Sequence, residues 1–104
     1  MSVARVNKFI AKKECINELQ EFLSEVCYEI RNAPGNLSAD LLQHQDSETE
    51  FLVIERWTNK EAHAASARAI PEEKLKAAKA LLAEAPSGSF YNDFNLELSE
   101  QDYL

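Results

Sequence analysis

The sequence predicts an α+β fold of the ferredoxin-like type, in which the elements follow one another as β-α-β-β-α-β around an antiparallel sheet. Short segments with alternating apolar residues indicate strands, and segments with apolar residues every three or four positions indicate helices. Two turn signals, at residues 33–36 and 85–88, divide the chain after predicted helices. We predict a single domain over residues 1–104, because this length is typical of one domain.

The first part of the chain is predicted to form a strand and a long helix. Residues 3–10 (VARVNKFI) carry apolar side chains at both parities, so both faces of this strand should be at least half covered. Residues 13–31 place apolar side chains on one stripe and glutamates elsewhere, as in an amphipathic helix with a solvated charged face. Pro34 and Gly35 should end this helix.

The next two strands are predicted to form a hairpin. Residues 37–45 form one strand, and the polar residues 46–49 turn the chain back. Residues 50–57 (EFLVIERW) are the strongest strand signal and are apolar on both faces, so this strand should be central in the sheet. His44 lies beside the polar loop, and we expect it at the surface or the rim.

Two helical segments are predicted to follow the hairpin. Thr58 or Asn59 should cap a short helix of small residues over 60–69. Pro71 should open the second segment, 72–84, because a proline at the first helical position has the φ angle that a helix requires.

The last strand is predicted over residues 89–98. The acidic tail beyond it should be loose, although Tyr103 and Leu104 could anchor it. Two helices cover only one face of such a sheet, yet the strands carry apolar residues on both faces. We therefore predict a homodimer, in which a second copy of the sheet covers the other face and closes a barrel-like interior.

The charge and composition disfavour several classes of partner. The net charge of −7 disfavours nucleic acid and an anionic membrane surface, since both attract clustered lysines and arginines. No apolar run approaches the ~18 residues that cross a bilayer, and the N-terminal residues lack the apolar region of a signal peptide. We expect a soluble cytoplasmic protein.

The cysteines indicate neither a disulfide nor a metal site. Cys15 and Cys27 lie twelve positions apart on one predicted helix, which separates them by ~18 Å, beyond the reach of a disulfide. Buried thiols are the expected alternative. The sequence has no cluster of cysteine and histidine with the spacing of metal ligands, so we predict no metal.

Three segments resemble the antibiotic biosynthesis monooxygenase (ABM) family. Residues 34–43 (PGNLSADLLQ) resemble the family's G-x-L-x-x-x-L strand entry. Residues 51–57 (FLVIERW) are similar to its F-x-x-x-E-x-W strand, and residues 59–62 (NKEA) to the helix start that follows. The resemblance covers about residues 3–98 and implies a dimeric α+β barrel.

The resemblance also implies a small set of activities. Some relatives oxygenate aromatic polyketides or quinols with oxygen and without metal or flavin, some degrade haem, and others isomerise small signalling molecules or have no known activity. Oxygenating members commonly carry histidines in the helix after the tryptophan. The corresponding places here are Ser66 and Pro71, and His63 lies one turn earlier.

Three residues are candidates for catalysis. His63 would accept a phenolic proton, which a histidine can do near neutral pH, although a lone helical histidine is more often solvated. Arg5 and Asn7 would stabilise the developing oxyanion. Haem-degrading relatives use an asparagine on the first strand, and Asn7 matches that place.

Five residues are candidates for substrate binding: Trp57, Phe9, Glu55, Ser66 and Tyr91. Glu55 has a second interpretation, because a buried carboxylate usually has a partner, here Arg5, Arg56 or a backbone donor. Trp57 and Tyr91 could equally serve packing.

Taken together, these residues and the resemblance predict a cofactor-independent monooxygenase, an oxidoreductase that acts with molecular oxygen on a small electron-rich aromatic such as a quinol or polyketide-like phenol. The alternative is a non-catalytic dimer that binds a small ligand or serves in a stress response. Haem binding is less favoured, because the predicted helix over 72–84 has no histidine to ligate iron.

Overall fold

The structure, a computed structural model, describes residues 2–94 of the chain. The elements along the chain are β1 (Ser2–Ile10), a 3-10 turn η1 (Lys13–Cys15), α1 (Ile16–Arg31), β2 (Asn36–Gln43), β3 (Glu50–Trp57), α2 (Lys60–Arg68), α3 (Glu72–Leu81) and β4 (Ser87–Asp93). The predicted α+β order is confirmed, with the second helical segment divided into α2 and α3.

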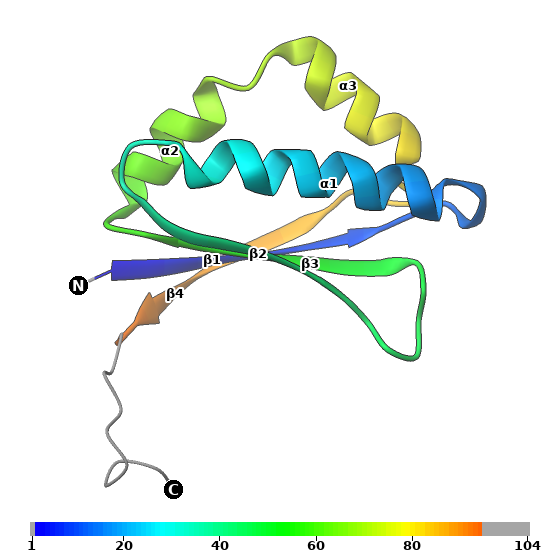
Figure 1. Cartoon of the computed structure of the whole chain (residues 1–104), viewed down its shortest axis with the longest axis horizontal. Coiled ribbons are helices and arrows are strands. Elements are labelled where there is room, and N and C mark those ends of the chain that lie inside the picture. The colour runs from blue at the N-terminus through cyan, green and yellow to red at the C-terminus, as the bar shows by residue number, and fades with distance from the viewer. Residues whose placement is uncertain (1, 95–104) are drawn as a thin grey trace, which may run out of the picture.

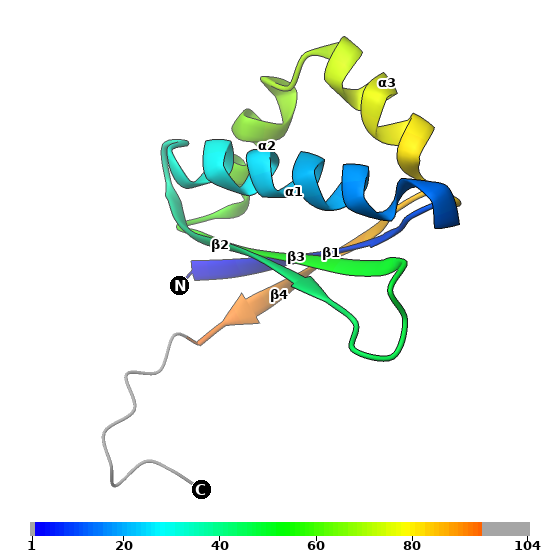
Figure 2. The same cartoon turned by 45° about the vertical axis from the view of Figure 1, so that its right-hand side comes forward.

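The four strands form one antiparallel sheet in the order β2-β3-β1-β4. All three helices lie on the same face of this sheet, as two views of the molecule show (Figure 1, Figure 2). β3 is central, as its apolar residues on both faces predicted, and β1 is its neighbour inside the sheet. β1 and β3 are therefore the two inner strands of the sheet.

The register decides which side chains face the helices. Arg5 pairs with Glu55 on β3 and with Phe90 on β4, so these three side chains lie on one face of the sheet. Phe51 and Val53 share this face and are 1% and 2% exposed. They form the core with buried residues of α1, namely Leu19, Leu23 and Cys27. α1 therefore covers the β2 and β3 side of the sheet tightly.

The second helical segment, Lys60–Leu81, forms an arch over the sheet (Figure 1). Neither α2 nor α3 contains a buried residue, because both are built from small and charged side chains. Lys74 of α3 forms an ion pair with Glu29 of α1, which ties the arch to the long helix. The arch thus stands off the sheet instead of packing onto it.

Several predicted element ends are wrong by a few residues. The first helix begins as the 3-10 turn η1, and α1 starts at Ile16. The helix predicted over 72–84 ends at Leu81, because Leu82 is extended and bridges to Ala11. Asn59, one of the two expected caps, accepts the Ala62 N–H at 2.8 Å.

The last strand also differs from its predicted range. β4 begins at Ser87 and ends at Asp93, so Phe94 lies beyond it. Leu96 and Leu98, and the expected anchors Tyr103 and Leu104, lie outside the described residues.

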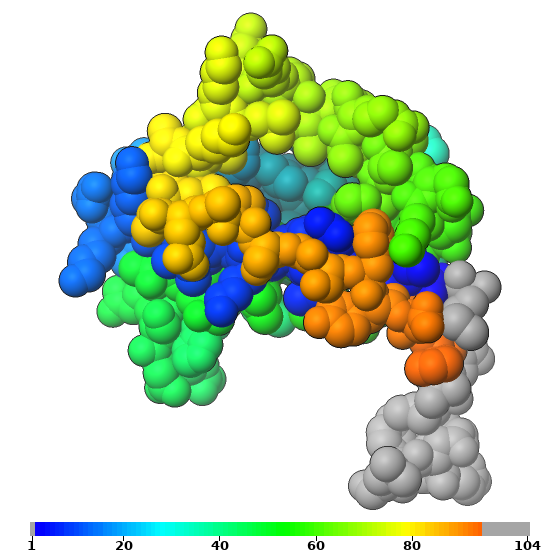
Figure 3. Space-filling model, turned by 180° about the vertical axis from the view of Figure 1, so that it is seen from behind, coloured from blue at the N-terminus to red at the C-terminus, as the bar shows by residue number. Residues whose placement is uncertain are grey.

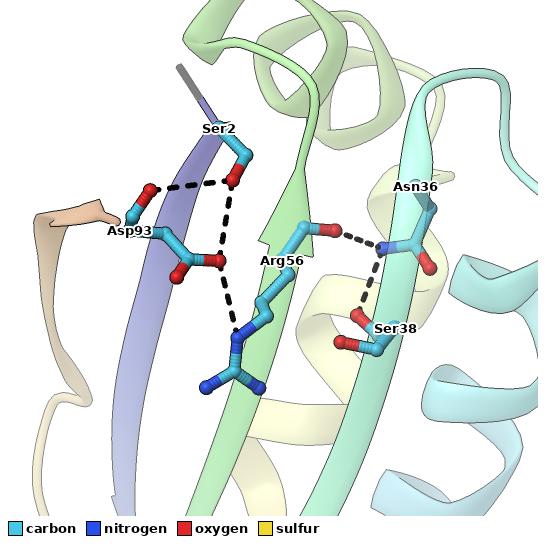
Figure 4. Close-up of polar contacts among 5 residues, drawn as sticks. All are labelled: Ser2, Asn36, Ser38, Arg56 and Asp93. Atoms are coloured by element: carbon cyan, nitrogen blue, oxygen red, sulfur yellow. Dashed lines mark hydrogen bonds and ion pairs between the residues drawn. The ribbon is translucent and has the colours of Figure 1, made fainter. Parts of the chain in front are cut away.

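The face of the sheet away from the helices is open. It carries the apolar residues Val6, Ile54, Leu52, Leu42 and Tyr91. Arg56 crosses this face to an ion pair with Asp93 at 3.2 Å, and the Ser2 hydroxyl donates to the same carboxylate (Figure 4). No helix within residues 2–94 has the length and apolar character needed to cross a membrane.

Candidate functional site

A cavity of about 710 Å³ lies between the sheet, α1 and the arch. Figure 3 shows it as a hollow beneath the arch and above β4, with α1 visible behind. Its walls are mainly apolar and include Phe9, Phe22, Val26, Ile30, Ala65, Ala69 and Leu75. Protein cavities of this volume and composition hold small organic ligands.

One wall of the cavity carries a hydrogen-bonded row of side chains from β1 and β3. Arg5 Nε donates to Asn7 Oδ1 at 3.0 Å, and Asn7 Nδ2 donates to Glu55 Oε2 at 2.8 Å. Trp57 Nε1 donates to Glu55 Oε1 at 2.9 Å. We call Arg5, Asn7, Glu55 and Trp57 the polar row. It forms because alternate residues of a strand share a face and Arg5 pairs directly with Glu55.

Glu55 is the buried carboxyl group of the row. Glu55 is only 5% exposed, and this burial raises the pKa of its carboxyl group above the ordinary 4.5. The Trp57 hydrogen bond, the Arg5 charge and the Asn7 hydrogen bond oppose this rise. Of the partners expected from the sequence, Arg5 reaches Glu55 only through Asn7, and Arg56 pairs with Asp93 on the other face.

His63 lies on α2 and reaches the cavity above the polar row. Its ring meets Trp57 edge-on at 5.7 Å between centroids and meets Phe90 edge-on at 5.1 Å. Burial, together with the nearby Arg5 charge, lowers the pKa of His63 below 6.5. The imidazole is therefore neutral at physiological pH and has a nitrogen lone pair that can accept a proton.

Phe90 is a site residue that the sequence analysis did not identify as such. It is partly buried on β4, and the Arg5 guanidinium carbon lies 4.7 Å from the centre of its ring. Lys60 Nζ lies 5.1 Å from the same centre. The signal was present in the strand alternation, but the pairing of Phe90 with Arg5 depends on the register of two distant segments.

The expected place of Tyr91 is wrong. Tyr91 pairs with Ala4, so its side chain points to the open face of the sheet, where it is 56% exposed. Successive strand residues face opposite sides, and Phe90 is the one on the helix side, where its ring contacts His63.

The other expected substrate contacts divide into two groups. Phe9 and Ser66 line the cavity, as do Arg5, Asn7, Glu55 and His63. Trp57 is fully buried behind the cavity wall, and its ring contacts His63 there.

Outside the cavity, His44 is exposed at the hairpin loop, as predicted. Its Nδ1 accepts the Asp46 N–H at 3.0 Å. This contact lies within the hairpin loop, and His44 is not among the residues that line the cavity.

The described residues contain no cluster suited to a metal ion. No group of three or more histidine, cysteine, aspartate or glutamate side chains converges within residues 2–94. α3 contains no histidine that could ligate a haem iron. Both cysteines are free thiols, with Cys27 buried and Cys15 partly buried.

Comparisons with known proteins agree with this architecture. The family model described as antibiotic biosynthesis monooxygenase (ABM) matches residues 2–81. A provisionally named antibiotic biosynthesis monooxygenase from Nitrosomonas europaea superposes with a TM-score of 0.81 at 20% identity, over 89% of this chain and 90% of that chain. The comparison with curated protein sequences gives no match.

Two further solved structures show the same fold. Rv0793 from Mycobacterium tuberculosis has a TM-score of 0.80 at 19% identity, over 94% of this chain and 100% of that chain. A mutant of SnoaB, a cofactor-independent oxygenase from Streptomyces nogalater, has a TM-score of 0.77 at 20% identity, over 94% of this chain and 98% of that chain. The family model covers most of the described residues, and the chain belongs to the antibiotic biosynthesis monooxygenase family.

Proposed function

We propose that the protein is a cofactor-independent monooxygenase that acts on a small electron-rich aromatic, such as a quinol or a polyketide-like phenol. The observation that carries the proposal is the position of His63 and Arg5 in the lining of one largely apolar cavity, where burial lowers the pKa of His63. A neutral imidazole can accept a proton, and a neighbouring guanidinium can stabilise the anion that remains.

In the proposed reaction, the substrate supplies the electrons. His63 accepts the phenolic proton, and the resulting anion transfers electrons to molecular oxygen. One oxygen atom is added to a substrate carbon, and the other leaves as water with two hydrogens of the substrate. An anthrone-like phenol becomes a quinone in this way, and a quinol becomes a hydroxyquinone. The apolar walls exclude bulk water from the anion, which strengthens its interaction with Arg5.

The remaining members of the polar row position the catalytic groups. Asn7 uses its carbonyl oxygen to hold Arg5 and one N–H to hold Glu55, so one N–H of its amide is left for a substrate oxygen. Trp57 donates to Glu55 and thereby orients its carboxylate, which in turn accepts from Asn7 and holds the amide in position. Phe9 and Ser66 contribute an apolar and a polar contact to the bound ring.

We further propose that two copies associate through the open face of the sheet. Val6, Ile54 and Leu52 leave an apolar surface there that no element within residues 2–94 covers. Light scattering at micromolar concentration should report a dimer, and a monomer would contradict this assembly. The cytoplasmic location expected from the sequence stays a prediction.

A non-catalytic ligand-binding dimer is the second candidate. Ser66 and Pro71 occupy the helix positions where oxygenating relatives commonly carry histidines, and both line the cavity. In that case a small aromatic would bind without oxygen consumption. Haem binding, the third possibility, would give a Soret shift on titration with haem.

Oxygen uptake distinguishes these candidates. Chelator-treated protein should consume oxygen with at least one member of a panel of quinols and anthrone-like phenols. His63→Ala should lower that rate by ~100-fold or more, the usual contribution of a general base. His44→Ala is the matched control, because His44 is exposed and outside the cavity. An unchanged rate in His63→Ala would remove His63 from the mechanism.

A further inference from the structure

We propose that the cavity selects ligands that carry a permanently ionised carboxylate, and that this carboxylate binds the Arg5 guanidinium. The inference concerns the same cavity as the proposed oxygenase and specifies its substrate class as an aromatic acid. It rests on the proposed function only for the oxidisable ring of that acid. In such an acid the Arg5 Nη groups bind the carboxylate, the positive charge of Arg5 still acts on the nearby phenolate, and the remaining N–H of Asn7 donates to the phenolate oxygen.

The Arg5 guanidinium has unused hydrogen-bond donors. Its Nε–H donates to Asn7, and no side chain or backbone oxygen within residues 2–94 accepts from its Nη atoms. No carboxylate of the described residues forms an ion pair with it either, because the Asn7 amide lies between Arg5 and Glu55. Two parallel N–H groups of a guanidinium match the two oxygens of a carboxylate.

The guanidinium is held in place before any ligand binds. Asn7 fixes it through Nε, and the Phe90 ring lies 4.7 Å from its central carbon. Gly88, opposite Asn7 on β4, leaves the space that the group occupies. A Cβ atom at Gly88 would overlap both Arg5 Nη2 and Asn7 Oδ1. A larger residue here would therefore displace the Arg5 guanidinium from its position beside Asn7.

The other charged groups of the cavity already have partners. Glu29 and Lys74 pair with each other, and Glu55 accepts from Asn7 and Trp57. Arg5 is thus the cation that the cavity leaves for a ligand. Gly88 is exposed on the edge strand, so the anion site lies toward the cavity mouth, with the apolar walls beyond it for the aromatic body.

The overall charge of the chain opposes the binding of an anionic ligand. A net charge of −7 repels anions at long range, so a preference for an anionic ligand must come from a local site. Salt screens the distant surface charges more than a partly buried pair. The preference for the anion should therefore persist at physiological ionic strength.

The test compares 2-naphthoate with its neutral analogue 2-naphthalenemethanol by calorimetry, under argon at neutral pH. Under these conditions no turnover is needed, so the result is independent of oxygenase activity. We expect the intact protein to bind naphthoate ~10-fold more tightly than the neutral alcohol, because a charge-assisted hydrogen-bonded pair raises affinity by about this factor. Equal affinities, or binding of neither compound at millimolar concentration, would overturn the proposal.

Three variants locate the site. Arg5→Met should abolish the preference while still binding the neutral compound, which also reports that the cavity is intact. Gly88→Ala keeps every charge yet displaces the guanidinium, so it should lose most of the preference. Lys60→Met is the matched control, because Lys60 also lies near the Phe90 ring but does not line the cavity. A preference retained in Arg5→Met, or lost only in Lys60→Met, would contradict the assignment.

Discussion

Replacing Asn7 by leucine tests the polar row most directly. The two side chains have similar shape, so the substitution removes hydrogen bonds and leaves little cavity. It removes the contact with Arg5 at 3.0 Å and the contact with Glu55 at 2.8 Å. Each bond involves a charged group and is worth about 1.5–3 kcal/mol, so the upper limit is about 6 kcal/mol.

The measured loss should be smaller than that limit. Arg5 is partly exposed, so its freed Nε–H can turn to water, and Glu55 keeps the hydrogen bond from Trp57. These two contacts recover part of the loss, so we expect the free energy of unfolding to fall by about 2–4 kcal/mol.

Urea unfolding followed by tryptophan fluorescence measures this loss. Trp57 is the single tryptophan of the chain and is fully buried beside Glu55, so its emission should report unfolding of the site itself. Asn92→Leu is the matched control, because Asn92 is exposed on β4 and makes no side-chain hydrogen bond within residues 2–94. A loss below about 1 kcal/mol, no larger than that of the control, would refute the role of Asn7 as the link between two charged groups.

Three further predictions concern pH and assembly. The raised pKa of Glu55 means that the folded state binds more protons than the unfolded state above pH 4.5, so stability should fall as the pH rises through this window. Glu55→Gln should remove that fall in the urea midpoint, and a fall that persisted in the variant would assign it to another group. The lowered pKa of His63 has the opposite sign: stability should fall as the pH drops below 6.5, and His63→Phe should flatten this part of the profile. If stability fell with pH by the same slope in His63→Phe, the pKa of His63 would not be the cause of this fall. Ile54→Glu places a charge on the open face and should shift light scattering from dimer to monomer, whereas Tyr28→Glu on the exposed side of α1 should not. A dimer that survives Ile54→Glu would mean that the copies associate elsewhere.

The family resemblance and the element order were both accessible from the sequence, for a local reason. Strand and helix periodicities are properties of neighbouring residues, and residues 50–57 show this most clearly, since the predicted strand matches β3 at both ends. The ends of α3 and β4 were less predictable. Leu82 is extended because it bridges to Ala11, and no local sequence pattern predicts this long-range contact.

The candidate site was predicted in part. Arg5, Asn7, Phe9, Glu55, His63 and Ser66 were all named from the sequence, and the structure brings all six to one cavity. The partners of Glu55 were not foreseen, since an arginine or a backbone donor was expected and the amide of Asn7 and the indole of Trp57 are found. Strand parity could suggest these neighbours, but only the pairing of β1 with β3 brings them within hydrogen-bonding distance.

By itself, the sequence determined which segments are strands and helices and which strand is apolar on both faces. It also indicated a short helix of small residues over 60–69 and a second helical segment that begins after Pro71. Only the tertiary structure decided that Phe90 and not Tyr91 lies on the helix side of the sheet, and that Gly88 makes room for Arg5. The physical reason is that these contacts join residues more than eighty positions apart, and their register follows from how whole strands align.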